Sequence, residues 1–421
     1  MTDLALKAES VDLPSPAITP RQAALIILAL AAGSFGLGTG EFTIMGLLPD
    51  IARDLLIAVP TAGHLISAYA LGVVVGAPAI ALVAAKLSRR TLLLVLMLGF
   101  GIANLASAVA PTLSTLALAR FLSGLPHGAY FGVAALVAAS VARPGRRAQA
   151  VGRVMLGLTT ATLLGTPLVA WLGQHFGWRS LFVLVGMLGL VTVTLLWLTL
   201  PRDEVHHEAS AARELGALMR PQVWLTFAFA SVGFGGMFAV FSYIASTATL
   251  VAGLPSTFMP VILALFGAGM VVGNLLGAWL ADRALMRTLG GMMVFNVAVL
   301  IVFALTASMP VMLCTCVFLI GFGVALAPAV QTRLMDVAGD AQTLAAASMH
   351  SAFNIANAAG AWLGGLAIAA GYGYASTGWV GAALGVAGLG IFAFSWWLER
   401  QHPTRGPSPR GAAARSQPVQ A

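Results

Sequence analysis

Long stretches of apolar and small residues recur along the chain and are separated by short polar segments. Most extend over about 20 residues, the length that an α-helix needs to cross roughly 30 Å of hydrocarbon. Because a backbone in lipid must satisfy its own hydrogen bonds, such stretches predict helices. Twelve spans are expected, over residues 22–47, 61–84, 91–110, 114–140, 149–172, 179–200, 222–250, 258–281, 288–307, 310–332, 343–370 and 376–398.

The longest polar stretch between spans divides them into two sets of six. We therefore expect an all-α membrane protein with twelve transmembrane helices in two six-helix bundles. The expected segments are a disordered N-terminus over residues 1–20, an N-terminal bundle over 21–200, a central loop over 201–221, a C-terminal bundle over 222–399 and a disordered tail over 400–421.

The two halves are related by an internal repeat. A gap-free alignment at an offset of 197 relates residues 74–86, VVGAPAIALVAAK, to residues 271–283, VVGNLLGAWLADR. Both stretches close the second span of their half and end on the same side of the membrane. Equal orientation indicates a parallel repeat, in which two bundles are related by an axis along the membrane normal.

The basic residues orient the spans. Of 22 Lys and Arg, Arg120 lies deep inside a span, and Arg53 and Arg179 lie near span ends on one side. The other 19 lie on the opposite side or at its helix mouths. Because such residues concentrate on the cytoplasmic side, both termini and the central loop are expected in the cytoplasm of a bacterial-type inner membrane. The pI near 10.3 thus indicates topology and not nucleic-acid binding.

Composition excludes several kinds of chemistry. Only 9% of the 421 residues are charged, against about 25% in soluble domains. Cys314 and Cys316 are two residues apart in one span, where side chains do not face each other, so neither a disulfide nor a metal pair is expected. No Gly-x-x-x-x-Gly-Lys-Ser/Thr loop occurs, which excludes direct drive by ATP. We expect no cofactor.

One carboxyl group stands apart from the others. Of 14 Asp and Glu, Glu41 is the only one well inside a span. An unpaired charge there costs at least a few kcal/mol, so Glu41 is expected to be neutral, paired or exposed to a water-filled cavity. Arg120 is a candidate partner, because at about 1.5 Å per residue both lie roughly 12 Å from the outer ends of their helices. A structural ion pair is the alternative to a role in proton exchange.

Three further observations concern a proton pathway and a substrate cavity. His127 lies seven residues after Arg120, on nearly the same helix face, and imidazole ordinarily titrates near neutral pH. A packing histidine is the alternative. Polar or aromatic residues within spans are candidate cavity residues, although bonds between helices are the commoner role. They are Tyr69, Asn104, Tyr130, Phe241, Tyr243, Asn354 and Asn357.

Together these features resemble the major facilitator superfamily over roughly residues 20–400. Its loop motif, Gly-x-Leu-Ala-Asp-Arg-x-Gly-Arg-Lys, is kept in the second half around Asp282 and Arg283. The first half keeps the basic end only, as Lys86, Arg89 and Arg90. The resemblance implies that these loops contribute to gating.

Within that superfamily the chain is most similar to the twelve-helix drug/proton antiporters, in particular the arabinose-efflux-like and chloramphenicol-resistance-like members. The stretches that carry the similarity are GEFTIMGLLPDIARDL, SAYALGVVVGAP, RFLSGLPHGAYFGV and FNIANAAGAWLGG. The resemblance identifies Arg120 as the span-four arginine implicated in proton coupling. It also implies a hinge in span five at Gly165 and Pro167, where the proline is displaced by one position from the antiporter motif.

The sequence thus predicts a secondary active transporter that works as a monomer by alternating access, with protons, a small molecule and the bilayer as partners. The absence of further charge inside the spans favours a neutral or weakly polar substrate of drug or sugar type. We expect proton-coupled efflux, with proton symport of an imported solute as the alternative. A receptor would not need the repeat, and an intramembrane enzyme would need paired catalytic groups that do not occur.

Overall fold

The computed structural model describes residues 19–42, 44–57, 59–83, 87–165, 168, 172–173, 175–201, 219–339 and 342–401. Every regular element in these ranges is helical. In the first half they are α1 (Pro20–Phe42), α2 (Ile44–Asp54), α3 (Val59–Ala62), α4 (His64–Val83), α5 (Arg89–Ala108), α6 (Leu113–Ser140), α7 (Arg147–Thr160), η1 (Ala161–Gly165) and α9 (Arg179–Thr199).

The second half holds the longer elements. They are α11 (Pro221–Gly233), α12 (Gly235–Phe241), α13 (Ile244–Ser246), η2 (Thr247–Val251), η3 (Ser256–Phe258), α14 (Met259–Thr306), α15 (Pro310–Phe322), η4 (Gly323–Ala325), α16 (Leu326–Ala338), α17 (Gln342–Ala367), η5 (Ile368–Tyr372) and α18 (Ser376–Gln401). The predicted all-helical membrane fold is confirmed.

The predicted spans correspond to these helices with two differences. Nine helices in the described ranges are long and apolar enough to cross a membrane, and a shorter apolar helix, His64–Ala77, lies within α4. The predicted span five corresponds to α7 and η1. The predicted break between residues 281 and 288 is a kink with non-helical backbone at Ala284, where two helices meet within the segment labelled α14. Span five is followed as far as Gly165, and its continuation to residue 172 lies largely outside the described residues.

Local sequence sets several helix starts. The Ser88 side chain accepts a hydrogen bond from Thr91 N at 3.2 Å at the start of α5. Thr112 and Thr115 form a capping box at the start of α6, in which each side chain bonds the backbone N–H of the other. These bonds satisfy N–H groups that have no partner within a helix. The helices α5 and α6 therefore begin directly after the polar capping residues Ser88 and Thr112.

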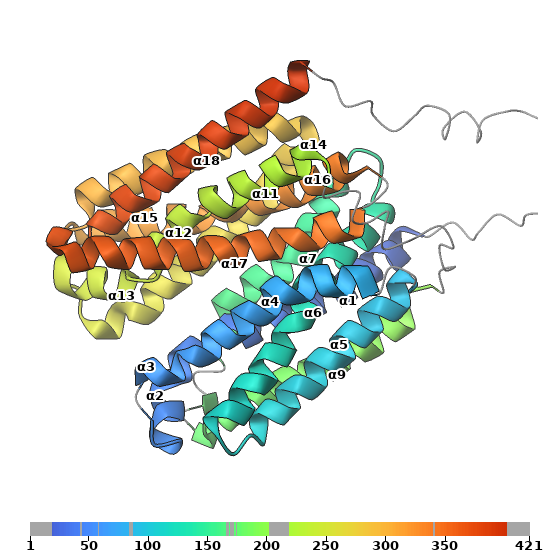
Figure 1. The fold of residues 1–421 in the computed structure, drawn as a ribbon, viewed down its shortest axis with the longest axis horizontal. Coiled ribbons are helices and arrows are strands. Elements are labelled where there is room, and N and C mark those ends of the chain that lie inside the picture. The colour runs from blue at the N-terminus through green and yellow to red at the C-terminus, as the bar shows by residue number, and fades with distance from the viewer. Residues whose placement is uncertain are drawn as a thin grey trace, which may run out of the picture.

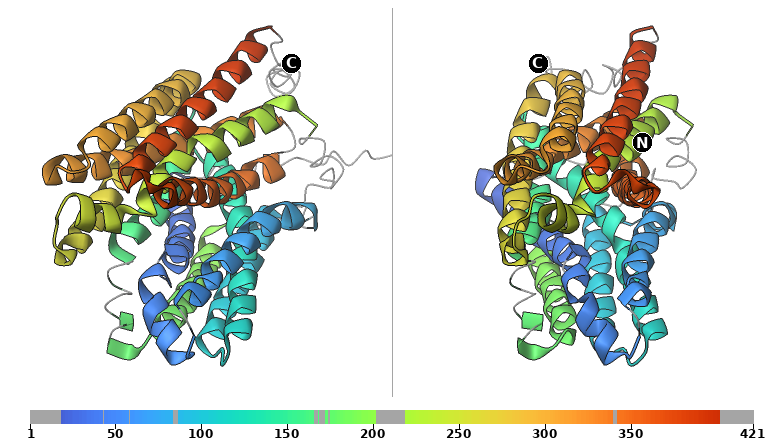
Figure 2. Two further views of the ribbon diagram at one scale, coloured as in Figure 1. Left: turned by 60° about the vertical axis from the view of Figure 1, so that its left-hand side comes forward. Right: turned by 90° about the vertical axis from the view of Figure 1, so that its left-hand side faces the viewer.

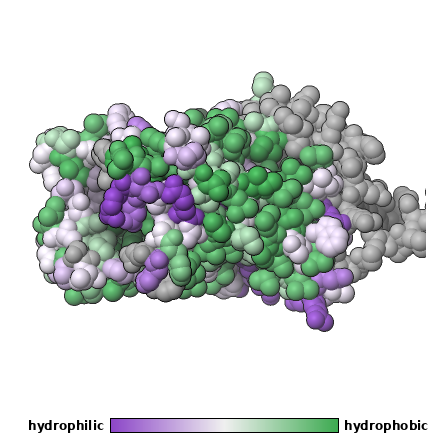
Figure 3. All heavy atoms as spheres, turned by 90° about the horizontal axis from the view of Figure 1, so that it is seen from below, coloured by the Kyte–Doolittle hydropathy of each residue, from purple (hydrophilic) through white to green (hydrophobic). Residues whose placement is uncertain are grey.

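The helices form two bundles (Figure 1). We call α1 to α9 the N bundle and α11 to α18 the C bundle. Exposed large apolar residues such as Leu28, Val95 and Leu118 cover the outside of the N bundle. Figure 3 shows a broad hydrophobic surface over the middle of one face, with hydrophilic residues nearer its ends. This distribution fits a protein that faces lipid around its middle.

The bundles meet at one end of the molecule and diverge toward the other (Figures 1 and 2). They meet at the end that carries Arg143, Arg146 and Arg287, which we call the basic side. There α17 packs against α4 and α6, and α7 packs against α14 and α16. At the opposite end α2 and α3 stand apart from α13 (Figure 2). The structure is therefore the state that is closed on the basic side.

Polar bonds close the opposite end of the N bundle. Asp54, at the end of α2, accepts hydrogen bonds from the Arg179 guanidinium and from Trp178 Nε1, the latter at 3.1 Å. The bond from Arg179, with a smaller contribution from Trp178, holds the pKa of the Asp54 carboxyl below its usual value. These bonds tie α2 to the start of α9 within one bundle.

Small residues allow the closest approach between the bundles. A Cβ atom added to Gly132 of α6 would lie 2.6 Å from the Ala347 backbone nitrogen of α17, closer than real Cβ atoms come. In lipid such small residues let helix backbones pack directly against each other. Closure on the basic side therefore depends on glycine at this position.

We expect Gly132→Ala to destabilise the closed basic side by about 1–3 kcal/mol, as overpacking does elsewhere. Spin labels at Leu56→Cys and Leu250→Cys, exposed by 92% and 70% at the opposite end of the two bundles, report this change. Their distance should shorten when the basic side opens, in a background without Cys314 and Cys316. Gly99→Ala is the control, because nothing lies within 4 Å of an added Cβ there. An unchanged distance in Gly132→Ala would contradict the prediction.

Candidate functional site

Glu41 lies near the end of α1, where it is 8% exposed. Its Oε2 atom is 3.9 Å from His127 Nε2 of α6. Arg120, also on α6, interacts with it electrostatically, but no ion pair within 4.0 Å joins the two among the described residues. The predicted neighbourhood of Glu41 and Arg120 is therefore present, while the direct contact of Glu41 is with histidine.

The guanidinium of Arg120 is fully buried. It lies over the ring of Tyr69 from α4, 4.3 Å from the ring centroid, and 5.8 Å from that of Phe182. Its Nε and Nη1 atoms have no hydrogen-bond partner. A desolvated cation over an aromatic face gains on the order of 2 kcal/mol, far less than the cost of burial. The nearby carboxyl group of Glu41 adds to its stabilisation, most strongly when that group is ionised.

His127 connects the N bundle to the C bundle. Its Nδ1 is 2.8 Å from the Tyr69 hydroxyl, and its Nε2 is 3.2 Å from Nδ1 of His350 on α17. The ring of Phe131 stacks on His350 with centroids 4.0 Å apart. We call Glu41, Tyr69, Arg120, His127 and His350 the polar cluster. It is the place where buried ionisable groups of both bundles meet.

The sequence reasoning missed His350. It lies inside the predicted span 343–370, one helical turn before Asn354, which is one of the candidate cavity residues. Ionisable residues within spans are functional candidates by default, so the signal was present. What the sequence could not indicate is that His350 faces His127, 223 positions away in the chain.

The predicted cavity residues separate into three groups. Tyr69 belongs to the polar cluster, and Asn354 donates to the backbone oxygen of His350 at 3.0 Å. Asn104 and Tyr130 lie inside the N bundle, where they donate to the backbone oxygens of Phe100 and Leu30 at 2.8 Å. The rest lie in the C bundle: Phe241 stacks on Phe266, Tyr243 donates to the Ala361 oxygen and Asn357 is half-buried.

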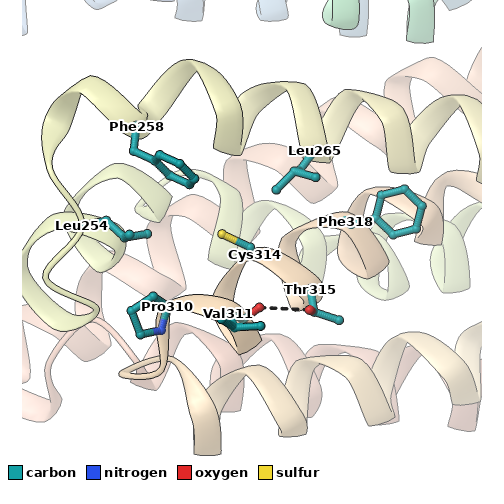
Figure 4. Close-up of a pocket in the computed structure, with 8 residues that line it drawn as sticks. All are labelled: Leu254, Phe258, Leu265, Pro310, Val311, Cys314, Thr315 and Phe318. Atoms are coloured by element: carbon teal, nitrogen blue, oxygen red, sulfur yellow. Dashed lines mark hydrogen bonds between the residues drawn. The ribbon is translucent and has the colours of Figure 1, made fainter.

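Two cavities in the described part of the chain lie away from the polar cluster. One of about 470 Å³ lies between α14, α15 and the segment before α14 (Figure 4). Its lining is apolar apart from Thr315, whose hydroxyl donates to the Val311 oxygen of its own helix at 2.9 Å. Another of about 770 Å³ lies between α5 and α6. Neither is lined by a residue of the polar cluster.

Asp282 joins the bundles on the basic side. It accepts hydrogen bonds from the backbone nitrogens of Ala148 at 2.7 Å and Gln149 at 2.9 Å, in the first turn of α7. A carboxylate at a helix N-terminus is favoured by the free N–H groups and by the helix dipole. A second pair, Arg147 and Asp336 at 3.2 Å, joins α7 to α16.

The other predicted gating and hinge residues take different positions. Arg283 lies over the ring of Trp279 at 3.4 Å, and Arg90 donates to the Trp197 oxygen at 2.8 Å. Arg89 begins α5. Gly165 ends the π-helical segment η1, where an added Cβ would lie 2.8 Å from the Thr39 hydroxyl. Lys86 and Pro167 lie outside the described residues.

Two helical bundles that meet around buried ionisable groups define a membrane transport protein. A family model described as the Major Facilitator Superfamily matches residues 30–304 and 253–420. The Inner membrane transport protein YdhP of Escherichia coli (strain K12) is 39% identical over 379 residues, 90% of this chain and 97% of YdhP. The Chloramphenicol resistance protein of Streptomyces lividans is 33% identical over 344 residues, 80% of this chain and 87% of that protein.

Solved structures agree on the fold. The proton:xylose symporter XylE superposes with a TM-score of 0.74 at 14% identity, covering 89% of this chain and 95% of XylE. The chain belongs to the Major Facilitator Superfamily. It is a secondary transporter of small molecules and a multi-pass inner-membrane protein, and its family consists of transporters and not enzymes.

We expect Asp282→Asn to weaken closure of the basic side by about 1–2 kcal/mol, because a charge-assisted bond at a helix terminus is lost. The distance between labels at Leu56→Cys and Leu250→Cys should shorten. The matched control is Asp336→Asn, which also removes a carboxylate between the bundles. That carboxylate pairs with an arginine exposed by 45%, and such a pair contributes only about 0–1 kcal/mol. Equal effects of the two variants would refute the prediction.

Proposed function

We propose that the chain is a proton-coupled exporter of small neutral or weakly polar compounds, and that Glu41 is its proton-coupling group. The observation that carries this proposal is the place of Glu41. It is a buried carboxyl group 3.9 Å from His127, which itself contacts His350 of the other bundle. A change in how the bundles meet therefore changes the surroundings of this carboxyl group.

Coupling requires that Glu41 bind its proton with different affinity in two states, since only a differential interaction shifts a conformational equilibrium. Opening of the basic side would separate His127 from His350 and admit water to the polar cluster. Arg120 would remain beside Glu41, because both belong to the N bundle. Each unit of pKa difference between states contributes about 1.4 kcal/mol to coupling.

For the substrate we propose contacts on the C bundle, from Asn354, Asn357, Phe241 and Tyr243, together with Tyr69 of the N bundle. Asn357 carries most of this assignment, because it is half-buried, one turn after Asn354, and has no partner among the described residues. In the described part of the chain, no charged side chain outside the polar cluster forms a hydrogen bond or ion pair with these residues, which favours an uncharged substrate. The resistance named for the Streptomyces lividans relative supports export as the direction.

We further propose that the basic side is the cytoplasmic side, so that both termini lie in the cytoplasm. The support is the excess of 19 basic residues over 2 between the two faces. A reporter that is active only in the periplasm, fused after residue 401, should remain inactive. The same reporter inserted after Leu56, at the opposite end, should be active. Activity of the fusion after residue 401 would reverse this topology.

Glu41→Gln should abolish uphill, pH-driven transport, because the amide cannot exchange a proton. The variant should still insert and still exchange substrate down its gradient. Glu41→Asp should keep part of the activity, since it keeps a titratable group with a shorter reach. The measurement is efflux of chloramphenicol and a panel of sugars and drugs from proteoliposomes with an imposed pH gradient. Asp50→Asn, an acid at the opposite end, is the control and should transport normally. Full pH-driven transport by Glu41→Gln would remove Glu41 from the mechanism.

A further inference from the structure

The Nε2 atom of His127 lies near two possible hydrogen-bond acceptors, which are Nδ1 of His350 and Oε2 of Glu41. The Tyr69 hydroxyl is a natural donor to His127 Nδ1, 2.8 Å away, since it has no other hydrogen-bond acceptor in the described part of the chain. A ring nitrogen that accepts is unprotonated, so the proton of neutral His127 lies on Nε2. That N–H faces His350 Nδ1 at 3.2 Å and Glu41 Oε2 at 3.9 Å.

The two acceptors differ in how strongly they compete. A hydrogen bond to a carboxylate is roughly twice as strong as one between neutral groups, whereas a protonated carboxyl group is a weak acceptor. The carboxyl group belongs to the same bundle as His127, and the imidazole of His350 belongs to the other. A bond to His350 therefore holds the bundles together, and a bond to Glu41 does not.

We propose that the hydrogen bond from His127 Nε2 to His350 is a latch between the bundles, and that the protonation state of Glu41 controls it. His350 is then the residue of the C bundle that responds to the protonation of Glu41. With Glu41 protonated, His127 donates to His350 and the basic side stays closed. When Glu41 releases its proton to water, its carboxylate takes the N–H and the bond between bundles is lost. This proposal rests on the proposed role of Glu41 as the proton-coupling group.

Other charged and titratable groups on helices that pack against α17 have partners of their own or lie at a far end of their helix. On α16, Arg333 is paired with Glu399 of α18 at 2.9 Å, and Asp336 with Arg147. On α6, the Tyr130 hydroxyl donates to the Leu30 oxygen, and on α4 the exposed His64 lies at the far end of the helix. Arg120 stacks on Tyr69 and stays in the N bundle. Among the described groups, Glu41 is the one carboxyl group in contact with the latch.

The test follows the distance between the bundles as a function of pH. Spin labels at Arg143→Cys and Arg287→Cys report the basic side, and labels at Leu56→Cys and Leu250→Cys report the opposite end, in chains without Cys314 and Cys316. In lipid nanodiscs, the unmodified cluster should give a closed basic side at low pH and a more open one at high pH. The ratio of the two populations should change by about 2- to 10-fold, the effect of one hydrogen bond.

Three variants separate the latch from a general loss of packing. His350→Leu removes the acceptor at similar volume, so the basic side should open and the distances should no longer respond to pH. His350→Asn places an amide oxygen near the position of Nδ1 and should restore the response. Glu41→Gln should keep the low-pH ratio of closed to open populations at every pH, and His64→Leu, on an exposed histidine, should behave like the unmodified chain. If His350→Leu does not insert, Tyr69→Phe tests the same bond, because His127 can then carry its proton on Nδ1 and the response should shrink.

A pH response that persists in His350→Leu, or that is absent from the unmodified chain, would overturn the latch. Neither result would by itself remove Glu41 from proton coupling, which is decided by efflux from proteoliposomes. Conversely, full pH-driven efflux by Glu41→Gln would remove the proposed function, whatever the distances show. The two failures are therefore distinguishable.

Discussion

The burial of one guanidinium group constrains the arrangement of the N bundle. Arg120 is fully buried with two nitrogen atoms that lack hydrogen bonds, and an isolated charge in that position would be unstable. The ring of Tyr69 stabilises the guanidinium in every state, and the carboxyl group of Glu41 does so most strongly when it is ionised. Tyr69 also bonds His127, so the groups that stabilise Arg120 are the groups that reach the other bundle. The side chains that stabilise the charge of Arg120 are thus also the ones that surround His127, the residue in contact with the other bundle.

The C bundle has its own polar centre on the basic side. Both Nη atoms of Arg333 donate to Glu399 at 2.9 Å, and Nη2 also donates to Gln222 at 3.3 Å. Ser395 donates to the same Gln222 oxygen at 2.6 Å. These bonds join α11, α16 and α18 without involving the N bundle. Each bundle is therefore held by internal polar bonds, while small residues and a few bonds form the contact between them, which favours motion of the bundles as rigid bodies.

The sequence predicted the elements of the fold well and the contacts between them less well. Span length and backbone satisfaction determine helices in lipid whatever the tertiary structure, so the spans could be recognised directly. Equal depth and helix phase brought Glu41, Arg120 and His127 into one hypothesis, and the structure has them together. Asn104 and Tyr130 have the same polarity as cavity residues but face the interior of a bundle, and a span cannot indicate which side of a helix faces a neighbour. The partners of His350 and Asp282 come from the other half of the chain and were inaccessible for the same reason.

The carboxylate of Asp282 has no counterpart in the other half of the repeat. The offset of 197 aligns it with Ala85, which has no carboxylate to offer a helix of the C bundle. The contact between α7 and α14 thus holds charge-assisted bonds, whereas the side-chain hydrogen bond between α6 and α17 in the described part of the chain joins two imidazoles within close packing. When the bundles separate, the weaker contact between α6 and α17 should break first. The basic side should then open by a rotation about the contact between α7 and α14, and a molecule that leaves the centre would pass beside α17.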